Sequence, residues 1–429
     1  MLGDLADPAP GSIVIGPFGS RMKADCYVSN GVPVIRGTNI SGDLSWKGDW
    51  VYISDNFADT MPNCNVREND LVFPHRGSIG EVAIVPGDRP RYMLSTSLMK
   101  FRANRIKVAP LFLFYYFRSP IGHHEILKFS SQVGTPGIGQ PLSSLRQFKV
   151  YLPPLSIQTA IANLLSALDD KIDLNRRMNE TLEAMARAIF KDWFVDFGPV
   201  RAKAEGRPPY LAPELWALFP DALDDEDKPV GWRVVSLSEF AYLNPESWSK
   251  NHQPVEIKYV DLANTKWGVI ETTQRFNWKE APSRAQRILR RGDTIVGTVR
   301  PGNGSFSFVG QDGLTGSTGF AVLRPKMDRY REFVYLSATS SENIERLTHL
   351  ADGAAYPAVR PDVIIETESI KSNEELLIHF SVIVEPLFSQ IESNKVMSKD
   401  LAQLRDLLLP KLMSGEIRLR EAKKAVEQA

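Results

Sequence analysis

The feature of this 429-residue sequence that most constrains its fold is an internal repeat of about 220 residues. Two segments, 155–194 and 376–413, carry apolar residues at heptad spacing and therefore predict two long helices. Polar residues interrupt both heptad patterns at equivalent places, and Asn175 and Asn394 are separated by 219 residues. Because this period is far longer than that of solenoid repeats, it indicates a duplicated domain.

The interruptions in the two heptad patterns predict how the helices pair. Each pattern places polar residues at two successive seam positions, which are Asn175 and Asn179 in the first helix and Asn394 and Ser398 in the second. A buried Asn is tolerated in a helix pair only opposite a partner that satisfies its amide, so such residues fix one register. We therefore expect an antiparallel coiled coil in which these four residues face one another. The alternative is that each helix belongs to the core of its own domain.

A strand-rich block with frequent turns precedes each helix. Residues 32–40 and 66–73 of the first block match residues 257–262 and 289–296 of the second in their alternation of apolar and polar positions. These patterns predict an α+β fold with two tandem globular domains of mixed, strand-rich character, each followed by a long helix. The expected boundaries are a first domain over 1–154, a central helical spacer over 155–198, a linker over 199–230, a second domain over 231–371, a C-terminal helical spacer over 372–415 and a tail over 416–429.

Composition and motif searches argue against several classes of protein. The chain has no phosphate-binding loop of the G-x-x-x-x-G-K-S/T type, no G-x-S-x-G nucleophile motif and no histidine or cysteine spacing typical of zinc. Lys plus Arg and Asp plus Glu both number 51, so net charge neither favours nor excludes a nucleic-acid partner. The two cysteines predict reduced thiols in a cytoplasmic protein, and no apolar run is long enough to span a membrane. We therefore expect no catalytic residue, metal or cofactor in this chain.

Two segments partly match enzyme motifs. Arg207-Pro-Pro-Tyr210 is similar to the loop that holds a flipped base in amino-methyltransferases, but Arg cannot accept the amino proton as Asn or Asp would. Acidic residues between 362 and 368, followed by Lys371, approximate a nuclease carboxylate cluster with a different spacing. A self-contained DNA methyltransferase or nuclease is therefore one alternative function. A duplicated adaptor that binds proteins and not DNA is another.

Several motifs occur in order along nearly the whole chain. They are GPFGS at 16–20, GVPVIRGTN at 31–39, YLPPLSIQ at 151–158, AIFKDWFVD at 188–196, GSTGFAVLRP at 316–325 and LLLPKLMSGEI at 407–417. Together they resemble the specificity subunits of type I restriction-modification systems. The second helix departs from this resemblance, because IKSNEE at 370–375 replaces the proline-rich segment that precedes the first helix.

The resemblance implies a DNA sequence-recognition subunit that carries no catalytic site of its own. Each domain would be a target recognition domain that reads one half of a bipartite site in double-stranded DNA, and the helix pair would hold the two readers at a fixed distance. Two modification (methyltransferase) subunits and the restriction (endonuclease and translocase) subunits would dock on this chain. S-adenosylmethionine, ATP and magnesium would be bound by those partner subunits.

Polar and basic residues beside glycine turns are the candidates for DNA contacts, because Arg and Asn suit guanine and adenine edges while Ser and Thr suit phosphates. They are Arg36, Thr38, Asn39, Arg76 and Ser78 in the first domain, and Thr298, Arg300, Asn303, Ser317 and Thr318 in the second. Each of them could instead be a turn or surface residue. Ser317 and Thr318 have counterparts in Ser95 and Thr96, which indicates a role in the shared fold.

Overall fold

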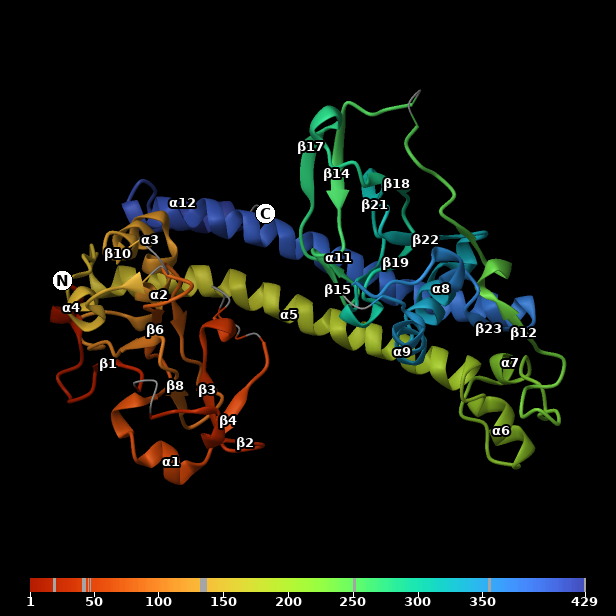
Figure 1. Ribbon diagram of the computed structural model, residues 1–429, viewed down its shortest axis with the longest axis horizontal. Helices are drawn as coiled ribbons and strands as arrows, with labels where there is room; N and C mark the ends of the chain where they lie inside the picture. Colours follow the sequence, from red (N-terminus) through yellow and green to blue (C-terminus); the bar gives the residue numbers. More distant parts are fainter. Residues whose placement is uncertain are drawn as a thin grey trace. The chain divides into compact units, whose positions relative to one another are not determined.

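The structure is a computed structural model that describes residues 1–17, 21–40, 44, 46, 48–131, 137–249, 252–353 and 356–427. Residues 18–20 of the motif at 16–20 lie outside the described residues. The chain forms two compact units: unit 1 comprises Met1–Arg176 and Lys395–Ala429, and unit 2 comprises Arg177–Asn394. Each unit combines β-sheets with part of two long helices, α5 (Leu155–Phe194) and α11 (Glu374–Ser414) (Figure 1).

Unit 1 contains two main sheets. One has the strand order β1 (Ile13–Ile15), β9 (Leu98–Phe101), β6 (Leu71–Pro74) and β7 (Ala83–Ile84). The other has the order β2 (Tyr27–Val28), β4 (Val51–Ile53), β3 (Val32–Ile35), β8 (Tyr92–Leu94) and β5 (Asn65–Val66). The remaining elements are the strand pair β10 (Ser130–Ser131) and β11 (Gly137–Ile138) and the helices α1 (Asp55–Asp59), α2 (Pro110–Arg118), α3 (Pro120–Leu127), α4 (Pro141–Gln147) and α12 (Leu419–Glu427).

Unit 2 also contains two main sheets. One has the order β13 (Ala241–Leu243), β22 (Phe320–Pro325), β19 (Thr294–Gly297) and β20 (Phe306–Phe308). The other has the order β17 (Gln274–Asn277), β14 (Glu256–Val260), β21 (Leu314–Ser317) and β18 (Ala285–Leu289). The remaining elements are the strand pairs β12 (Arg233–Ser236) with β23 (Glu368–Lys371) and β15 (Thr265–Lys266) with β16 (Val269–Ile270), and the helices α6 (Gly198–Ala204), α7 (Pro213–Trp216), α8 (Arg331–Ala338), α9 (Ser341–Leu350) and α10 (Pro361–Ile365).

The two units share their sheet topology except that the second sheet of unit 1 has the additional strand β2. The order β1-β9-β6-β7 in unit 1 corresponds to β13-β22-β19-β20 in unit 2, and all pairs in both sheets are antiparallel. In the second sheet of each unit one pair is parallel, β3 with β8 in unit 1 and β14 with β21 in unit 2. This repetition, together with the pairing of α5 with α11 inside each unit, confirms the predicted α+β fold class.

A buried ion pair occurs at the same place in both units. Arg102 donates from Nε and Nη2 to the two carboxylate oxygens of Asp70, at 2.7 Å each. Arg324 holds Asp293 in the same two-bonded geometry, at 2.9 Å each. Both Asp side chains are 1% exposed, so each carboxylate depends on its Arg for compensation of its buried charge.

Residues 199–230, expected to form a linker, are folded as part of unit 2. This segment contains α6 and α7, and Val200 and Phe219 within it are buried. The Phe219 ring makes an edge contact with Trp193 of α5, with ring centres 5.3 Å apart. The expectation of a linker rested on proline content and charge, which do not reveal that isolated apolar residues anchor such a segment. The expected tail over 416–429 likewise contains α12, whose Ala422 is buried in the core of unit 1.

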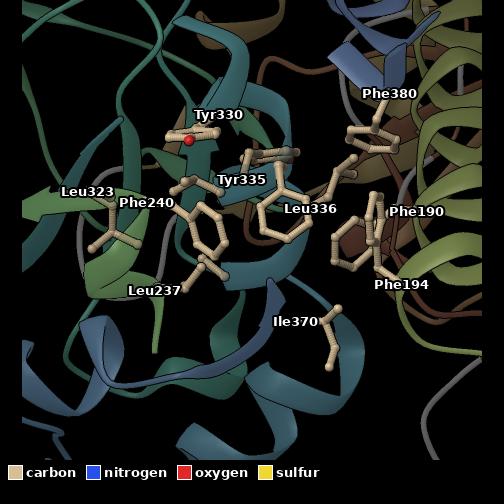
Figure 2. Close-up of a cluster of buried hydrophobic side chains, with 14 of the residues drawn as sticks. Phe190, Phe194, Leu237, Phe240, Leu323, Tyr330, Tyr335, Leu336, Ile370 and Phe380 are labelled. Atoms are coloured by element: carbon tan, nitrogen blue, oxygen red, sulfur yellow. The ribbon is translucent and has the colours of Figure 1, made fainter. Parts of the chain in front are cut away.

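The core of unit 2 joins its sheet to both long helices. Figure 2 shows Phe190 and Phe194 of α5, Phe380 of α11 and side chains of α8 in one cluster. The rings of Phe194 and Phe380 meet edge to face, with centres 5.1 Å apart, and Phe194 contacts Phe333 of α8 in the same manner. Aromatic pairs prefer this geometry, so these rings fix how both helices sit on unit 2.

The polar residues of the heptad seam form hydrogen bonds between the two helices. In unit 1, Asn175 donates from Nδ2 to Oγ of Ser398 at 3.1 Å. In unit 2, Asn394 donates from Nδ2 to Oδ1 of Asn179 at 2.9 Å and accepts a bond from Gln390. In unit 1 Asp169 of α5 also pairs with Arg405 of α11, and in unit 2 Phe190 of α5 contacts Phe380 of α11, so the helices are antiparallel in each unit. Asn175 and Asn394 are almost fully buried, and their amides therefore restrict the register of the pair.

The bond between Asn179 and Asn394 gives a direct test of helix pairing in unit 2. Replacing Asn394 with Leu leaves the Asn179 and Gln390 amides without their partner, so it should lower the free energy of unfolding by roughly 1–3 kcal/mol. The double variant Asn179→Leu/Asn394→Leu should lose less than the sum of the two single variants, as measured by denaturant unfolding. The control Ser393→Ala, at an exposed position of α11, should not change stability. Additive losses would contradict a shared hydrogen bond.

One buried carboxyl group in unit 2 lacks full hydrogen bonding. Glu332 of α8 is 2% exposed, and its Oε2 has no hydrogen-bond partner among the described residues. The pKa of Glu332 is raised to about 7, mainly because its carboxyl group is buried; a backbone hydrogen bond and Arg331 oppose this shift, and the charges of Glu385 and Asp328 add to it. The carboxyl group is therefore partly protonated at neutral pH, because burial disfavours its charged form.

The raised pKa of Glu332 predicts a pH-dependent stability. The folded protein retains a proton that the unfolded chain releases, so the stabilising contribution of this one group is fully present below about pH 4.5 and is lost as the pH rises through about 7. Glu332→Gln mimics the protonated form and should be more stable than the wild type above that pH, by roughly 2–3 kcal/mol. Thermal unfolding at about pH 5 and about pH 8 measures this difference. Glu342→Gln, at an exposed position of α9, is the matched control, and a Glu332→Gln curve parallel to wild type would refute the argument.

Candidate nucleic-acid interface

The first candidate segment of unit 1 is the turn after β3. The backbone N–H of Arg36 donates to Oδ1 of Asn39 at 2.9 Å, and the Arg36 guanidinium donates to the carbonyl of Asp49. Asn39 is fully buried, whereas Thr38 between them is exposed. Asn39 therefore holds the turn, and Thr38 is the residue that this turn presents to solvent.

The second candidate segment of unit 1 is the loop after β6. Arg76 and Ser78 in this loop are both exposed. The backbone of Arg76 pairs with Gly137, and the N–H of Ile138 donates to the carbonyl of His75 at 3.0 Å, so a second segment supports the loop. His75 is buried, with Nε2 3.0 Å from the carbonyl oxygen of Thr96, and burial lowers its pKa. The supporting residues are thus buried and the candidate contact residues are solvent-accessible.

Three candidates of unit 2, Thr298, Ser317 and Thr318, lie near the ends of β19, β21 and β22. Their hydrogen bonds go to backbone groups of the same unit. The hydroxyl of Thr298 donates to the carbonyl of Gly319 at 2.9 Å, and the hydroxyl of Ser317 accepts a bond from the N–H of Gly319 at 3.1 Å. Thr298 and Ser317 are 8% and 2% exposed. Thr318 is half-buried, and its N–H donates to the carbonyl of Arg284. These contacts hold the backbone at the ends of these strands.

The other candidates of unit 2 lie in the loop after β19, the counterpart of the Arg76 loop. Arg300 and Asn303 are exposed there, and the N–H of Arg300 donates to the carbonyl of Pro357 at 2.7 Å. Val299 pairs with Ala358 just as Arg76 pairs with Gly137, so a second segment supports this loop too. The structure thus places one exposed, Arg-bearing loop at the same strand end of each unit.

Two exposed aromatic residues next to the Arg300 loop were not among the sequence candidates. Trp267 lies in the turn between β15 and β16 and is 61% exposed, and Tyr356 is 72% exposed. The Arg300 guanidinium lies over the Tyr356 ring, 4.9 Å from its centre. The search favoured polar and basic residues beside glycines, whereas Trp267 precedes Gly268 and Tyr356 closely follows Gly353. Extending that search to aromatic residues would have found both.

The described residues show neither a metal site nor a membrane helix. Nowhere in the described ranges do three or more His, Cys, Asp or Glu side chains gather in a way that could hold a metal ion. None of the described helices combines the length and apolar character needed to cross a membrane.

Comparison with known proteins connects this architecture to one family. Residues 18–184 match the family model described as the type I restriction modification DNA specificity domain. The HindI specificity subunit of Haemophilus influenzae is 25% identical over 407 residues, which cover 82% of this chain and 87% of that protein. The MjaIX specificity subunit of Methanocaldococcus jannaschii is 25% identical over 410 residues, covering 89% and 88%. Over most of its length this chain is therefore similar to the specificity subunits of type I restriction-modification systems.

A solved structure has the same fold as this chain. The crystal structure of the type I restriction-modification S subunit from M. genitalium aligns with a TM-score of 0.55 at 15% sequence identity, covering 96% of this chain and 94% of that one. The likeness supports the duplicated architecture described above. The roles of individual residues rest on the contacts of this chain alone.

The difference between buried and exposed candidates can be tested in the turn after β3. Replacing Asn39 with Ala removes the acceptor of the Arg36 N–H and should lower the free energy of unfolding by about 1–2 kcal/mol. Thr38→Ala, at the neighbouring exposed position, should leave stability within about 0.5 kcal/mol of wild type. Thermal unfolding of both variants measures the difference. Equal losses would show that Asn39 does not hold the turn.

Proposed function

We propose that this chain is the DNA sequence-recognition subunit of a type I restriction-modification complex, and that each unit reads one half of a bipartite target in double-stranded DNA. The observation that carries this proposal is the repeated position of one exposed Arg-bearing loop, around Arg76 in unit 1 and around Arg300 in unit 2, on two copies of the same sheet topology. Two copies of one scaffold with different exposed loop residues suit the reading of two different sequences.

The candidate contact residues divide according to their exposure. Thr38, Arg76, Ser78, Arg300 and Asn303 are exposed, so these five are the proposed DNA contacts. Arg suits a guanine edge and Asn an adenine edge, whereas the hydroxyl groups suit phosphate oxygens. The remaining candidates, Arg36, Asn39, Thr298, Ser317 and Thr318, are proposed to shape the loops from within.

The two long helices are the proposed docking surface for the partner subunits. Large apolar side chains are exposed along both helices, among them Leu174 and Met178 of α5 and Val382, Val396 and Leu407 of α11. Apolar side chains repeated along a helix surface suit burial by helices of another protein. The partners would be two modification subunits and the restriction subunits. Those subunits would bind S-adenosylmethionine, ATP and magnesium and perform methylation, translocation and cleavage in the cytoplasm.

Exchange of one unit's reading domain tests the proposal. Residues 1–154 would be replaced by the corresponding block of a family member with a different target, which leaves α5 and α11 intact. In the complex with modification subunits, mapping of methylated adenines should show one altered half-site and one retained half-site, because each unit reads independently.

Two controls accompany this exchange. Replacement of residues 231–371 should alter the other half-site instead, and a change of both half-sites in either chimera would contradict independent reading. Incubation of the specificity subunit alone with DNA and S-adenosylmethionine should give no methylation. Methylation by the chain alone would favour the alternative of a self-contained methyltransferase.

A further inference from the structure

Arg287 of β18 is a half-buried cation with no carboxylate partner among the described residues. Within the part of the chain that the structure describes, its guanidinium makes one hydrogen bond, from Nη1 to Oγ of Ser247 at 3.2 Å, and its buried Nε has no partner. Burial lowers the pKa of this guanidinium, because it disfavours the charged form. Buried polar groups are nearly always hydrogen-bonded, so an unpaired one requires an explanation.

Two other half-buried arginines of unit 2 show what Arg287 lacks. Arg324 belongs to the buried ion pair described above and also pairs with Glu246 at 2.9 Å. Arg346 donates from Nε and Nη2 to Oδ1 of Asn343, at 3.1 and 2.8 Å. In both residues the Nε–H group is satisfied by an oxygen of the protein. The Nε–H group of Arg287 is aimed at no such oxygen, so its acceptor must come from outside the described chain.

A β-bulge turns the Arg287 side chain to the face of the sheet opposite that of Ala285. In the pairing of β18 with β21, Ala285 lies opposite Ser317. Arg287 lies opposite Gly316, the preceding residue of β21, which makes Gln286 an extra residue. Consecutive residues of β21 point to opposite faces, so their partners on β18 do the same. Bulges at sheet edges re-aim side chains and are frequent beside functional sites.

The shared fold does not require an arginine at this position. Ile288 of β18 pairs with β21, and Asn65 of β5 pairs with β8, in each case two residues before the Ser that the units share. The residue before Asn65 is the buried Cys64, which is therefore the counterpart of Arg287. Unit 1 builds the same sheet without a cation here, so Arg287 belongs to what unit 2 presents and not to the common scaffold.

Arg287 lies near the strand ends that carry the candidate reading loop of unit 2. The N–H of Thr318 donates to the carbonyl of Arg284 at 2.8 Å, which joins the start of β18 to the end of β21. The N–H of Thr298 donates to the carbonyl of Gly319 at 2.8 Å, which joins the same turn to the end of β19. The start of β18 and the loop after β19 therefore lie on the same side of unit 2.

The unmet donors of Arg287 fit a phosphate group. Guanidinium N–H groups and Ser hydroxyls both bind phosphate oxygens, and the Ser247 hydroxyl that accepts from Arg287 can still donate its own hydrogen. A phosphate lies on the outside of a duplex, so a recessed donor can reach it. Base edges lie at the floor of a groove and require a side chain that projects into it. The half-buried Arg287 therefore suits the DNA backbone and not a base.

We propose that Arg287, together with the hydroxyl of Ser247, binds one phosphate group of the DNA backbone in the half-site recognised by unit 2. The phosphate supplies the negative charge and the acceptor that the described part of the protein does not. This inference rests on the proposed function of unit 2 as a DNA reader. It adds a contact that positions the duplex against β18 while the loop after β19 meets the bases.

The salt dependence of DNA binding by the complex with modification subunits tests this contact. Arg287→Gln should weaken binding by the same factor for duplexes with the correct and with an altered unit 2 half-site, because a phosphate contact carries no sequence information. The slope of log K against log salt should become shallower by about 0.9, the value for one phosphate of B-DNA. Ser247→Ala removes a hydroxyl and no charge, so it should weaken binding and leave the slope unchanged.

A matched control and modified duplexes make this test specific. Arg275→Gln changes an exposed Arg of β17, at the opposite edge of the same sheet, that pairs with Glu256 at 3.5 Å, and it should alter neither affinity nor slope. Duplexes that carry one uncharged methylphosphonate locate the phosphate. At one position in the unit 2 half-site this group should weaken binding by wild type but not by Arg287→Gln, in which the contact is already absent. Equal effects on both proteins at every position would contradict the contact.

Thermal unfolding separates a ligand contact from a role in the fold. Removal of a half-buried charge without a partner should leave the Tm of Arg287→Gln at or above that of wild type. A lower Tm with an unchanged salt slope would show that Arg287 serves the fold, and the inference would be wrong while unit 2 remained a reader. If inorganic phosphate raised the Tm of wild type but not of Arg287→Gln and the slope stayed unchanged, the site would bind a small phosphate compound and not DNA. If exchange of residues 231–371 left both half-sites unchanged, the proposed function of unit 2 would fail instead.

Discussion

The buried ion pair repeated in the two units is the interaction on which the proposed reading loops depend. Asp70 and Asp293 each accept two hydrogen bonds from an Arg side chain and one from the backbone N–H three residues earlier. Those backbone bonds close the turns that start β6 and β19, and the other ends of these strands carry Arg76 and Arg300. A buried carboxylate is costly without its partners, so the turn, the strand and the loop are fixed together.

A fixed scaffold with variable loops explains how two units of one topology can differ in what they present. The supporting bonds recur between the loop after β6 and the segment at 137–138, and between the loop after β19 and the segment at 357–359. The exposed side chains recur only in part: both loops carry an Arg, but unit 1 adds Ser78 where unit 2 adds Asn303 and an aromatic neighbour. Buried polar bonds thus maintain the geometry, and the solvent-facing residues are free to change.

Much of the fold could be predicted from the sequence because heptad spacing and the long repeat are strong signals. The polar seam residues indicated a paired helix register, and their hydrogen bonds lie between α5 and α11. The candidate site was harder, since Asn39, Thr298 and Ser317 have the same side chains that serve either turns or DNA contacts. The exposure of each side chain in the structure separates residues that hold a turn from residues that can reach a ligand. Trp267 and Tyr356 were missed because exposed aromatic residues look like core residues in a sequence.

Unit 1 is discontinuous in the chain, and this has a consequence for how the protein is made. Its core includes Leu165 and Leu168 of α5 but also Leu408 and Leu412 of α11, and the whole of unit 2 lies between them in sequence. A ribosome therefore delivers all residues of unit 2 before the last core residues of unit 1 emerge. Unit 2 can complete its core during synthesis, whereas the nascent unit 1 keeps an uncovered apolar face on α5 until translation ends, which exposes it to aggregation and to chaperones.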